Sequence, residues 1–316
     1  MRVIGIGDNV CDKYEHLRLM FPGGQAANFA VYAGMLGAES AYMGVFGRDE
    51  VAEHVIATLD ELQVEHSRCR QYEGENGYAR VTLVDGDRVF LGSNKGGVLK
   101  ENPLNLDVED LEYIKTFDHV HTTNNSYFDE QLPKLAEQGI SVSYDFSGQW
   151  IDEERVKKVA PYITYAFLSC GSVSREDAEE ICKKMFRAGC PMVIATRGSY
   201  GAVLFDGTQF YEQPPHLVEA VDTLGAGDSF ATAFLLSFLE SRKKYGIGAA
   251  YGDALMAAIG VGFYQGFSDL RQVIQKKCIY KPDLERHELY KPFRKLFDEL
   301  YRCNQEILHS LSKHNK

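Results

Sequence analysis

Short runs of β-branched and aromatic residues alternate along this chain with stretches that have helical periodicity. The predicted strands lie at 3–6, 119–122, 141–146, 166–169 and 192–196, and predicted helices at 132–138, 178–188 and 229–239. Strands that alternate with helices favour a mostly parallel sheet covered on both faces. Because ligands of such sheets bind beyond the carboxyl ends of the strands, the pattern also predicts where a site would lie.

The composition narrows the classes of protein that this chain can belong to. Its 316 residues, 45% of them hydrophobic, suit a single large α/β domain. The formal net charge of −11 argues against nucleic-acid binding, and no apolar run approaches the ~20 residues of a membrane span. The seven cysteines form no CxxC pair, which predicts reduced thiols in the cytoplasm and gives no sign of a zinc site.

Residues 78–91 follow a different pattern, with apolar residues at alternate positions on either side of Asp85-Gly86. This pattern predicts a β-hairpin with a tight turn. A hairpin inserted into an α/β domain serves as a lid over a site, as an oligomer contact, or as a surface hairpin without a role, and the pattern leaves these alternatives open.

The end of the chain carries one apolar helical stripe. Its members, spaced three or four residues apart, are Phe293, Leu296, Leu300, Cys303 and Ile307. Residues 271–316 hold 11 Lys and Arg against 6 Asp and Glu. We expect an extra helical tail that docks on the domain and leaves a solvated basic face.

The segment with the most chemical information places small residues where a helix is predicted to begin. It reads Asp222-Thr223-Leu224-Gly225-Ala226-Gly227-Asp228. Small residues let the backbone approach a ligand closely, and the unpaired N–H groups of a helix start favour an anion. Donors fixed around a transferring phosphoryl group would stabilise its transition state.

Asp228 follows these small residues in the first predicted helical turn. It could accept the proton of an attacking hydroxyl group. The helix dipole is expected to keep it ionised with a low pKa, so it would orient the hydroxyl first and take the proton late. The alternative is a capping acid after a glycine-rich turn.

A second glycine-rich turn opens another predicted helix, at Gly23, Gly24 and the residues up to Asn28, and this helix ends at Gly37. The Asn28 side chain offers both a donor and an acceptor for sugar hydroxyl groups. The alternative is that the small residues serve only helix packing.

Asp12 follows the first predicted strand closely. A carboxylate at a strand end can accept hydrogen bonds from two adjacent sugar hydroxyl groups. An exposed loop acid without a function is the alternative.

A further turn follows the predicted strand at 192–196 and contains Thr196, Arg197, Gly198 and Gly201. These residues could lie near nucleotide phosphates. A tight turn between two strands explains the same glycines.

Other nucleotide-binding signatures are missing from the sequence. There is no GxxxxGK[ST] loop, no protein-kinase motif set, and no third glycine after Gly5-Ile6-Gly7. P-loop enzymes, protein kinases and dinucleotide-binding domains are therefore disfavoured.

The two glycine-rich segments together resemble the signatures of the ribokinase-like (PfkB) carbohydrate kinase family, over roughly residues 1–267. The resemblance implies a three-layer α/β/α domain with a small β lid, built from residues around 11–20 and 68–97. It implies Mg²⁺-ATP as phosphoryl donor and a small sugar as acceptor, and it leaves a homodimer through the lid open.

The resemblance also implies roles for single residues. Asp228 would be the catalytic base and Gly225, Ala226 and Gly227 the anion hole. The implied sugar contacts are Asp12, Gly23, Gly24 and Asn28, and the implied nucleotide contacts are Thr196, Arg197, Gly198 and Gly201.

Within the family, three stretches are similar to the branch that phosphorylates fructoselysine, a fructose unit with a lysine adduct. They lie at 7–14, 87–90 and 144–150, and the second makes Arg88 a candidate substrate contact. Two alternatives stay open: a kinase for another sugar, such as fructose, ribose or a nucleoside, and a sugar- or nucleotide-binding protein that has lost catalysis. The Asn-x-x-Glu element of many members is Ser169-Cys170-Gly171-Ser172 here, so the metal ligands stay unknown.

Overall fold

The computed structural model describes residues 1–245 except 16, 85–86, 172 and 216–224. The described residues belong to one compact unit, Met1–Ala250. Residues 222–224 of the predicted anion-binding segment, the Asp85-Gly86 turn and the predicted tail helix lie outside the described residues.

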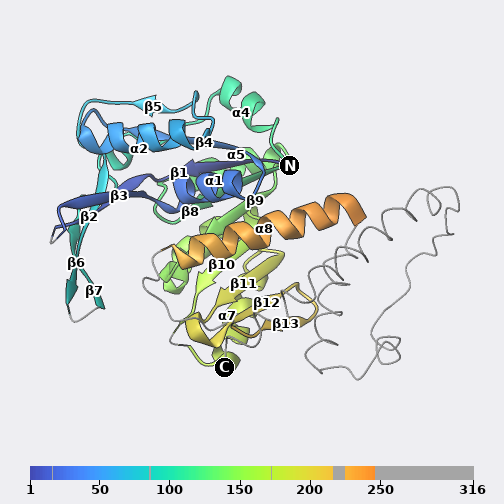
Figure 1. The fold of residues 1–316 in the computed structure, drawn as a ribbon. Helices are drawn as coiled ribbons and strands as arrows, with labels where there is room; N and C mark the ends of the chain where they lie inside the picture. Colours follow the sequence, from blue (N-terminus) through green and yellow to red (C-terminus); the bar gives the residue numbers. More distant parts are fainter. Residues whose placement is uncertain (16, 85–86, 172, 216–224, 246–316) are drawn as a thin grey trace, which may run out of the picture. The chain divides into compact units, whose positions relative to one another are not determined.

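A nine-stranded sheet forms the centre of this unit, in the order β13-β12-β11-β10-β9-β8-β1-β4-β5 (Figure 1). Neighbouring strands from β5 to β11 pair in parallel, and β12 and β13 are added antiparallel. The strands are β1 (Arg2–Gly7), β4 (Glu39–Phe46), β5 (Arg70–Gln71), β8 (His119–Thr123), β9 (Val142–Asp145), β10 (Tyr165–Ser169), β11 (Met192–Thr196), β12 (Ala202–Phe205) and β13 (Phe210–Gln213). All five predicted strands are therefore confirmed.

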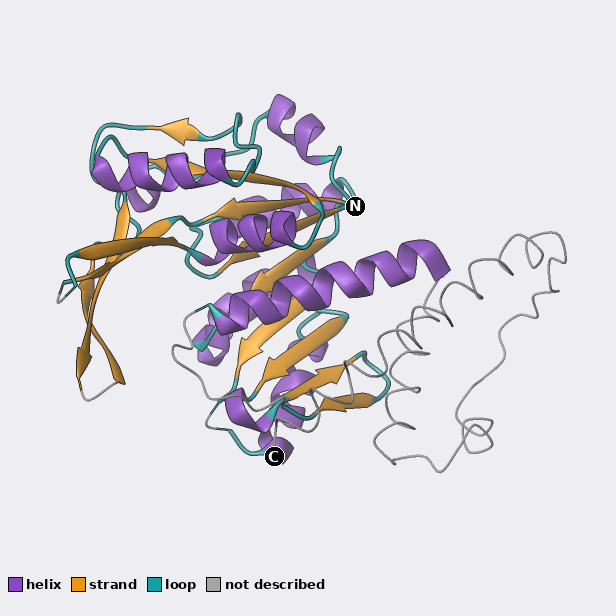
Figure 2. Ribbon diagram, in the orientation of Figure 1, coloured by secondary structure: helices purple, strands orange, loops and turns teal. Residues whose placement is uncertain are grey.

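Helices cover both faces of this sheet, which confirms the predicted three-layer α/β/α architecture (Figure 2). One face packs against α1 (Gln25–Met35), α2 (Glu50–Glu61) and α8 (Ala226–Tyr245). The other packs against α3 (Val98–Glu101), α4 (Val108–Ile114), α5 (Leu132–Glu137), α6 (Glu153–Val159) and α7 (Arg175–Arg187). Short 3₁₀ turns are η1 (Asp129–Gln131), η2 (Gln149–Ile151), η3 (Ala160–Tyr162) and η4 (Gly198–Tyr200).

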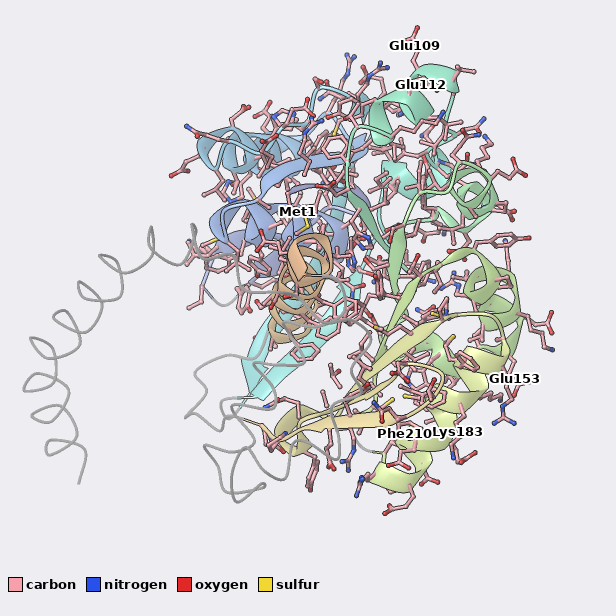
Figure 3. The ribbon with its side chains drawn as sticks, turned by 90° about the vertical axis from the view of Figure 1, so that its right-hand side faces the viewer. Met1, Glu109, Glu112, Glu153, Lys183 and Phe210 are labelled. Carbon is pink, nitrogen blue, oxygen red and sulfur yellow. The ribbon has the colours of Figure 1, made fainter. Side chains whose placement is uncertain are left out.

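Apolar side chains from both layers fill the two faces of the sheet. Phe29 of α1 and Leu235 of α8 share one buried cluster with Val3 of β1, so these two helices lie side by side. At the far edge, the Lys183 ammonium of α7 lies 5.6 Å from the ring centre of Phe210 on β13 (Figure 3). Among the described helices, none is both long and apolar enough to cross a bilayer.

A second, four-stranded sheet stands apart from the first, in the order β3-β2-β6-β7. Its strands are β2 (Val10–Tyr14), β3 (Leu19–Gly23), β6 (Gly77–Val84) and β7 (Asp87–Ser93). We call it the lid sheet. It contains the predicted hairpin, and the parallel strands of the main sheet end on the side that faces it (Figure 1). Residues 70–71 pair with β4 instead and belong to the main sheet.

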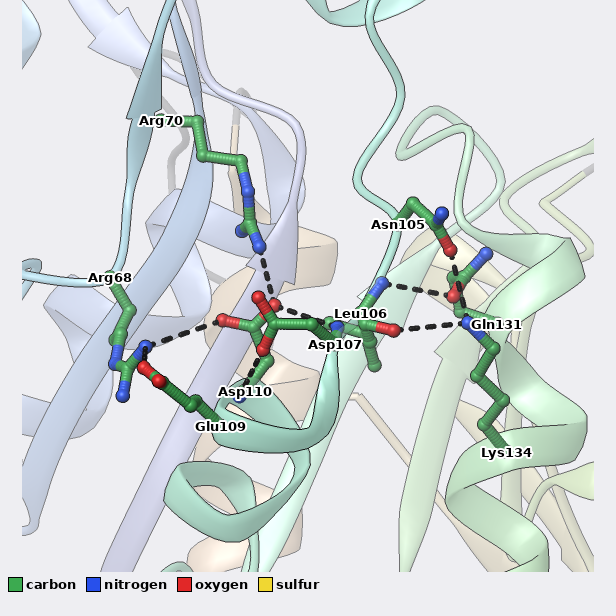
Figure 4. A network of polar contacts seen from close by, with 9 residues as sticks. All are labelled: Arg68, Arg70, Asn105, Leu106, Asp107, Glu109, Asp110, Gln131 and Lys134. Atoms are coloured by element: carbon green, nitrogen blue, oxygen red, sulfur yellow. Dashed lines mark hydrogen bonds and ion pairs between the residues drawn. The ribbon is translucent and has the colours of Figure 1, made fainter.

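Ion pairs secure the segment between β5 and α5 (Figure 4). Asp110 is 1% exposed, pairs with Arg70 and lies 3.8 Å from Arg68. It also closes a capping box with Asp107 at the start of α4. A buried charge is tolerated only with such partners, so this network fixes α4 against the edge of the sheet.

Candidate active site

The starts of the helices differ in how their free N–H groups are satisfied. Asp49, Asp152 and Ser174 accept hydrogen bonds from the first turns of α2, α6 and α7, as N-cap residues do. The N-cap residue of α1 is Gly24, which has no side chain for this purpose. The N–H groups of α1 therefore need an acceptor from elsewhere in the fold.

Asp8, directly after β1, is that acceptor. Its Oδ2 accepts from the N–H of Gln25 at 2.8 Å and its Oδ1 from that of Ala26 at 3.3 Å. The hydroxyl groups of Thr123 and Ser126 donate to Oδ1 at 2.8 and 3.0 Å. Asp8 is 4% exposed, and these four donors and the positive end of the helix dipole stabilise its charge. Our sequence reasoning missed this residue, although an acid directly after a strand was a visible signal.

The backbone at Gly24 comes very close to the end of β1. Its φ angle is +97°, and a Cβ atom there would lie 2.7 Å from the Cα of Asn9 and from the carbonyl oxygen of Asp8. Only glycine fits this combination of backbone angle and close approach. The predicted glycine turn therefore locks the start of α1 onto the carboxyl end of β1.

One turn into α1, Asn28 reaches the start of α8. Its Nδ2 donates to Oδ2 of Asp228 at 2.7 Å. The structure thus brings together residues 200 positions apart that were predicted from two separate motifs. Among the described residues no donor bonds to the oxygen of the Asn28 amide, which can accept from a group such as a sugar hydroxyl.

The start of α8 is built differently from that of α1. The Ser229 N–H bonds to the Gly225 carbonyl at 2.8 Å, but the N–H groups of Ala226, Gly227 and Asp228 have no acceptor among the described residues. Ala226 and Gly227 are exposed, and Gly225 has a φ angle of +72°. Exposed N–H groups without a described acceptor, at the positive end of a 20-residue helix, are suited to hold an anion.

The pKa of Asp228 differs from our expectation. Burial raises it, and the Asp8 charge raises it further, while hydrogen bonds from Asn28 and Gln25 work against the rise. The prediction of a low pKa was therefore wrong, because desolvation outweighs the helix dipole here. A raised pKa makes this carboxylate a better base for an alcohol.

A third carboxylate, Asp145, ends β9 at the same edge of the sheet. It is 6% exposed, and its Oδ1 accepts from the Ser147 N–H at 2.6 Å. Burial, with smaller contributions from Asp228 and Asp8, raises its pKa to about 7. The Ser147 hydroxyl accepts from Nε2 of Gln25 at 3.0 Å and so links β9 to α1. The sequence marks this stretch, 144–150, only by its likeness to the family, because the burial of Asp145 depends on residues distant in the chain.

Asp12 lies on the lid sheet and not in an exposed loop. It is 9% exposed on β2, between Phe21 of β3 and Ala79 of β6. A Cβ atom at Gly23 would lie 3.2 Å from its Oδ2, so these two predicted sugar contacts are neighbours. The carboxylate at the end of β1 is Asp8. Arg88 lies on β7, but its side chain is outside the described part of the chain.

Hydrogen bonds among three asparagines connect the lid sheet to the end of β1. Asn9 is 1% exposed and its Oδ1 accepts from Nδ2 of Asn76 at 2.8 Å. Asn94 donates to the Asn76 carbonyl at 2.7 Å. Since Asn76 precedes β6 and Asn94 follows β7, both ends of the hairpin are held beside Asp8.

The predicted nucleotide contacts form a compact turn between β11 and β12. Thr196 ends β11 and donates to the Leu168 carbonyl at 3.3 Å, and Arg197 donates from Nε to the Val173 carbonyl at 3.2 Å. Gly198 begins η4 and Gly201 follows it. Four strand spacings separate β11 from β1, or about 19 Å. This group therefore lies on the same edge of the sheet as Asp8 but apart from it.

Comparison with known proteins gives consistent matches over most of the chain. The pattern of pfkB family carbohydrate kinases matches residues 9–262. The fructosamine kinase FrlD of Bacillus subtilis is 42% identical over 75% of this chain and 84% of its own. The fructoselysine 6-kinase of Escherichia coli is 33% identical over 73% of this chain and 86% of its own.

Solved structures show the same fold at lower identity. Arabidopsis thaliana ribokinase, complexed with ribose and ATP, aligns with a TM-score of 0.64 at 20% identity, over 76% of this chain and 85% of its own. Xylella fastidiosa fructokinase with bound ATP aligns with a TM-score of 0.61 at 18% identity, over 76% and 81% of the two chains. The ribokinase-like fold predicted from the sequence is thereby confirmed.

Proposed function

This chain belongs to the pfkB family of carbohydrate kinases, and from the geometry of its site we propose that it transfers the γ-phosphoryl group of ATP to a hydroxyl group of a fructosamine, such as fructoselysine. The observation that carries this proposal is the start of α8. A half-buried carboxylate there adjoins three N–H groups without an acceptor among the described residues. It is also bonded to Asn28 of the sugar-binding candidates.

The proposed reaction needs one base and one anion-binding group. Asp228 takes the proton of the substrate hydroxyl group as its oxygen forms a bond to the γ-phosphorus, and the bond from that phosphorus to the bridging oxygen of ADP breaks. The N–H groups of Ala226 and Gly227 face the charge that develops on the phosphoryl oxygens. Because the pKa of Asp228 is raised, proton transfer to it is less unfavourable than to an ordinary carboxylate.

ATP fits the described residues at two places along the strand ends. The start of α8 would hold the transferring phosphoryl group, and Thr196, Arg197, Gly198 and Gly201 would lie beside the rest of the nucleotide. No group of three metal-ligating side chains exists within the described residues. We therefore place Mg²⁺ mainly on the phosphates, which is how this ion usually binds, and it would neutralise phosphate charge during transfer.

Two observations support a fructosamine as the acceptor. The relatives named above act, by their names, on fructosamine and fructoselysine. In addition, Asp8, Asp145 and Asp228 lie within electrostatic reach of one another. A fructosamine carries a protonated amine that fructose lacks, and such a cation is favoured near this negative charge.

The test is ATP consumption with fructoselysine, a second fructosamine, fructose, ribose and a nucleoside. We expect the highest kcat/KM with a fructosamine, and a loss of about 10³-fold in Asp228→Asn. Preference for another sugar would change the proposed substrate and leave the proposed kinase activity in place. An Asp228→Asn variant as active as the wild type would overturn the base assignment, and nucleotide binding without turnover would identify an inactive binding protein.

The proposal includes a homodimer through the lid sheet and a cytoplasmic location. Leu19 and Phe21 of edge strand β3 are 53% and 47% exposed, an apolar edge that a second lid could cover. Light scattering of the wild type and Phe21→Asp tests the homodimer, and a monomeric wild type would rule the homodimer out.

The five described cysteines form no disulfide, in keeping with a reducing compartment, which cell fractionation can check.

A further inference from the structure

Tyr32 of α1 lies one helical turn after Asn28, on the face of α1 that meets the start of α8. A Cβ atom at Gly225 would lie 2.8 Å from the Tyr32 hydroxyl oxygen and 3.8 Å from Cζ of its ring. The phenol therefore occupies the space that a side chain at this position would fill. Tyr32 belongs to neither the sugar contacts nor the anion-binding segment discussed above.

The surroundings of the Tyr32 hydroxyl link it to the same turn. Burial and the charge of Asp228 raise the pKa of Tyr32, while a hydrogen bond with Ser229 opposes the rise, so the phenol stays neutral. Ser229 in turn donates from its hydroxyl group to the Gly225 carbonyl at 2.8 Å. The hydroxyl group of Tyr32 thus lies beside both Ser229 and Gly225.

We propose that Tyr32 is a positioning residue that holds the Gly225–Gly227 turn in register with the substrate-binding start of α1. A glycine with a φ angle of +72° has no side chain to restrict it, so a neighbouring group must limit its freedom. Asn28 fixes the carboxylate of Asp228 and Tyr32 fixes the backbone before it. One helix, α1, would thereby set the distance between acceptor hydroxyl and phosphoryl group.

The inference rests on the proposed phosphoryl transfer, which depends steeply on alignment. A displacement of about 1 Å between reacting groups can lower a rate about 10²-fold. A positioning role predicts a loss in kcat without a matching rise in KM, because the misplaced turn affects the transition state more than binding of either substrate.

The test compares Tyr32→Phe and Tyr32→Ala with a control, Tyr113→Phe. Tyr113 lies on α4, and its buried phenol oxygen has no described hydrogen-bond partner. We expect kcat to fall about 10-fold in Tyr32→Phe and about 10²-fold in Tyr32→Ala, with both KM values within about 2-fold. In Tyr32→Phe the acid limb of the pH–rate profile should stay in place, because the ring that covers this region and the hydrogen bond from Asn28 to Asp228 are both kept. The control should match the wild type.

A second measurement does not depend on the sugar. Titration calorimetry with ADP alone and with ADP plus aluminium fluoride, a planar mimic of the transferring phosphoryl group, should show unchanged ADP binding and about 10-fold weaker binding of the mimic in Tyr32→Ala. A wild type that binds no nucleotide would defeat the proposed function. Two outcomes would overturn only the role of Tyr32, provided that the wild type binds both probes. Either Tyr32→Ala binds them as tightly as the wild type, or its loss of kcat is explained by a lower melting temperature.

Discussion

The starts of α1 and α8 look alike in the sequence and differ in the structure. Both follow a glycine with a positive φ angle, and both point at the same edge of the sheet. At α1 the N–H groups of Gln25 and Ala26 are taken by the Asp8 carboxylate. At α8 those of Ala226 and Gly227 have no acceptor in the described part of the chain. The N–H groups of a helix start can bind an external anion only where they are not already taken.

The difference assigns opposite roles to the two glycines. Gly24 is enclosed by the backbone of Asp8 and Asn9, just after β1, while among the described residues Gly225 meets only the end of the Tyr32 side chain. A change at Gly24 should therefore disturb folding, and a change at Gly225 should disturb chemistry. The following predictions test this division.

The largest effect is expected for Gly225→Ala. The new Cβ meets the Tyr32 hydroxyl at 2.8 Å and the φ angle of +72° disfavours alanine, so the turn or the Tyr32 side chain must shift. Loss of well-aimed N–H donors should lower kcat about 10²- to 10³-fold, measured by steady-state ATP consumption. Gly37→Ala is the matched control, since its φ angle of +90° is equally unfavourable but nothing lies within 4 Å of the new Cβ. Equal losses in both variants would mean that backbone strain alone explains the result.

A smaller effect is expected for Asp8→Asn, which removes the acceptor charge from the start of α1. The variant should lose about 1–2 kcal/mol of unfolding free energy, measured by denaturant titration. The acid limb of the pH–rate profile should move to lower pH, because the Asp8 charge no longer raises the pKa of Asp228.

Asp152→Asn, which alters the cap of α6, serves as the control for Asp8→Asn. It should lose a similar amount of stability and leave the pH–rate profile unchanged. If Asp8→Asn also left the profile in place, the electrostatic link between the two helix starts would be refuted.

The smallest effect concerns Asp145 and the pH dependence of stability. Its pKa rises from 3.8 when unfolded to about 7 when folded, so the folded state holds more protons between these values. The unfolding free energy should therefore fall as the pH rises from about 4 to 7. In Asp145→Asn the unfolding free energy should fall less steeply with pH. Some decrease remains, because the raised pKa of Asp228 has an effect of the same sign. Melting temperatures across that range measure it, and parallel curves for the two proteins would contradict the assignment.

The sequence allowed prediction of the features that depend on local pattern. The alternation of elements predicted the layers, and the positions of Gly24 and Gly225 predicted two glycine turns that open helices. Tertiary burial decided the rest. The raised pKa of Asp228 depends on groups 200 or more positions away, and Asp12 is covered only because β3 and β6 pair with β2. No periodicity within one segment reports such neighbours.

The parallel pairing of β2 with β6 has a consequence for how the site is made. Asp12 pairs with Ala79, so the chain must close a loop of more than sixty residues before Asp12 gains this neighbour. Contacts between such distant residues cost loop-closure entropy and form slowly. The intervening α1, β4 and α2 can assemble first, and during synthesis on the ribosome the lid sheet can be completed only after β6 has emerged. Asp12, although near the start of the chain, thus reaches its place only after residues 77–84 have joined it.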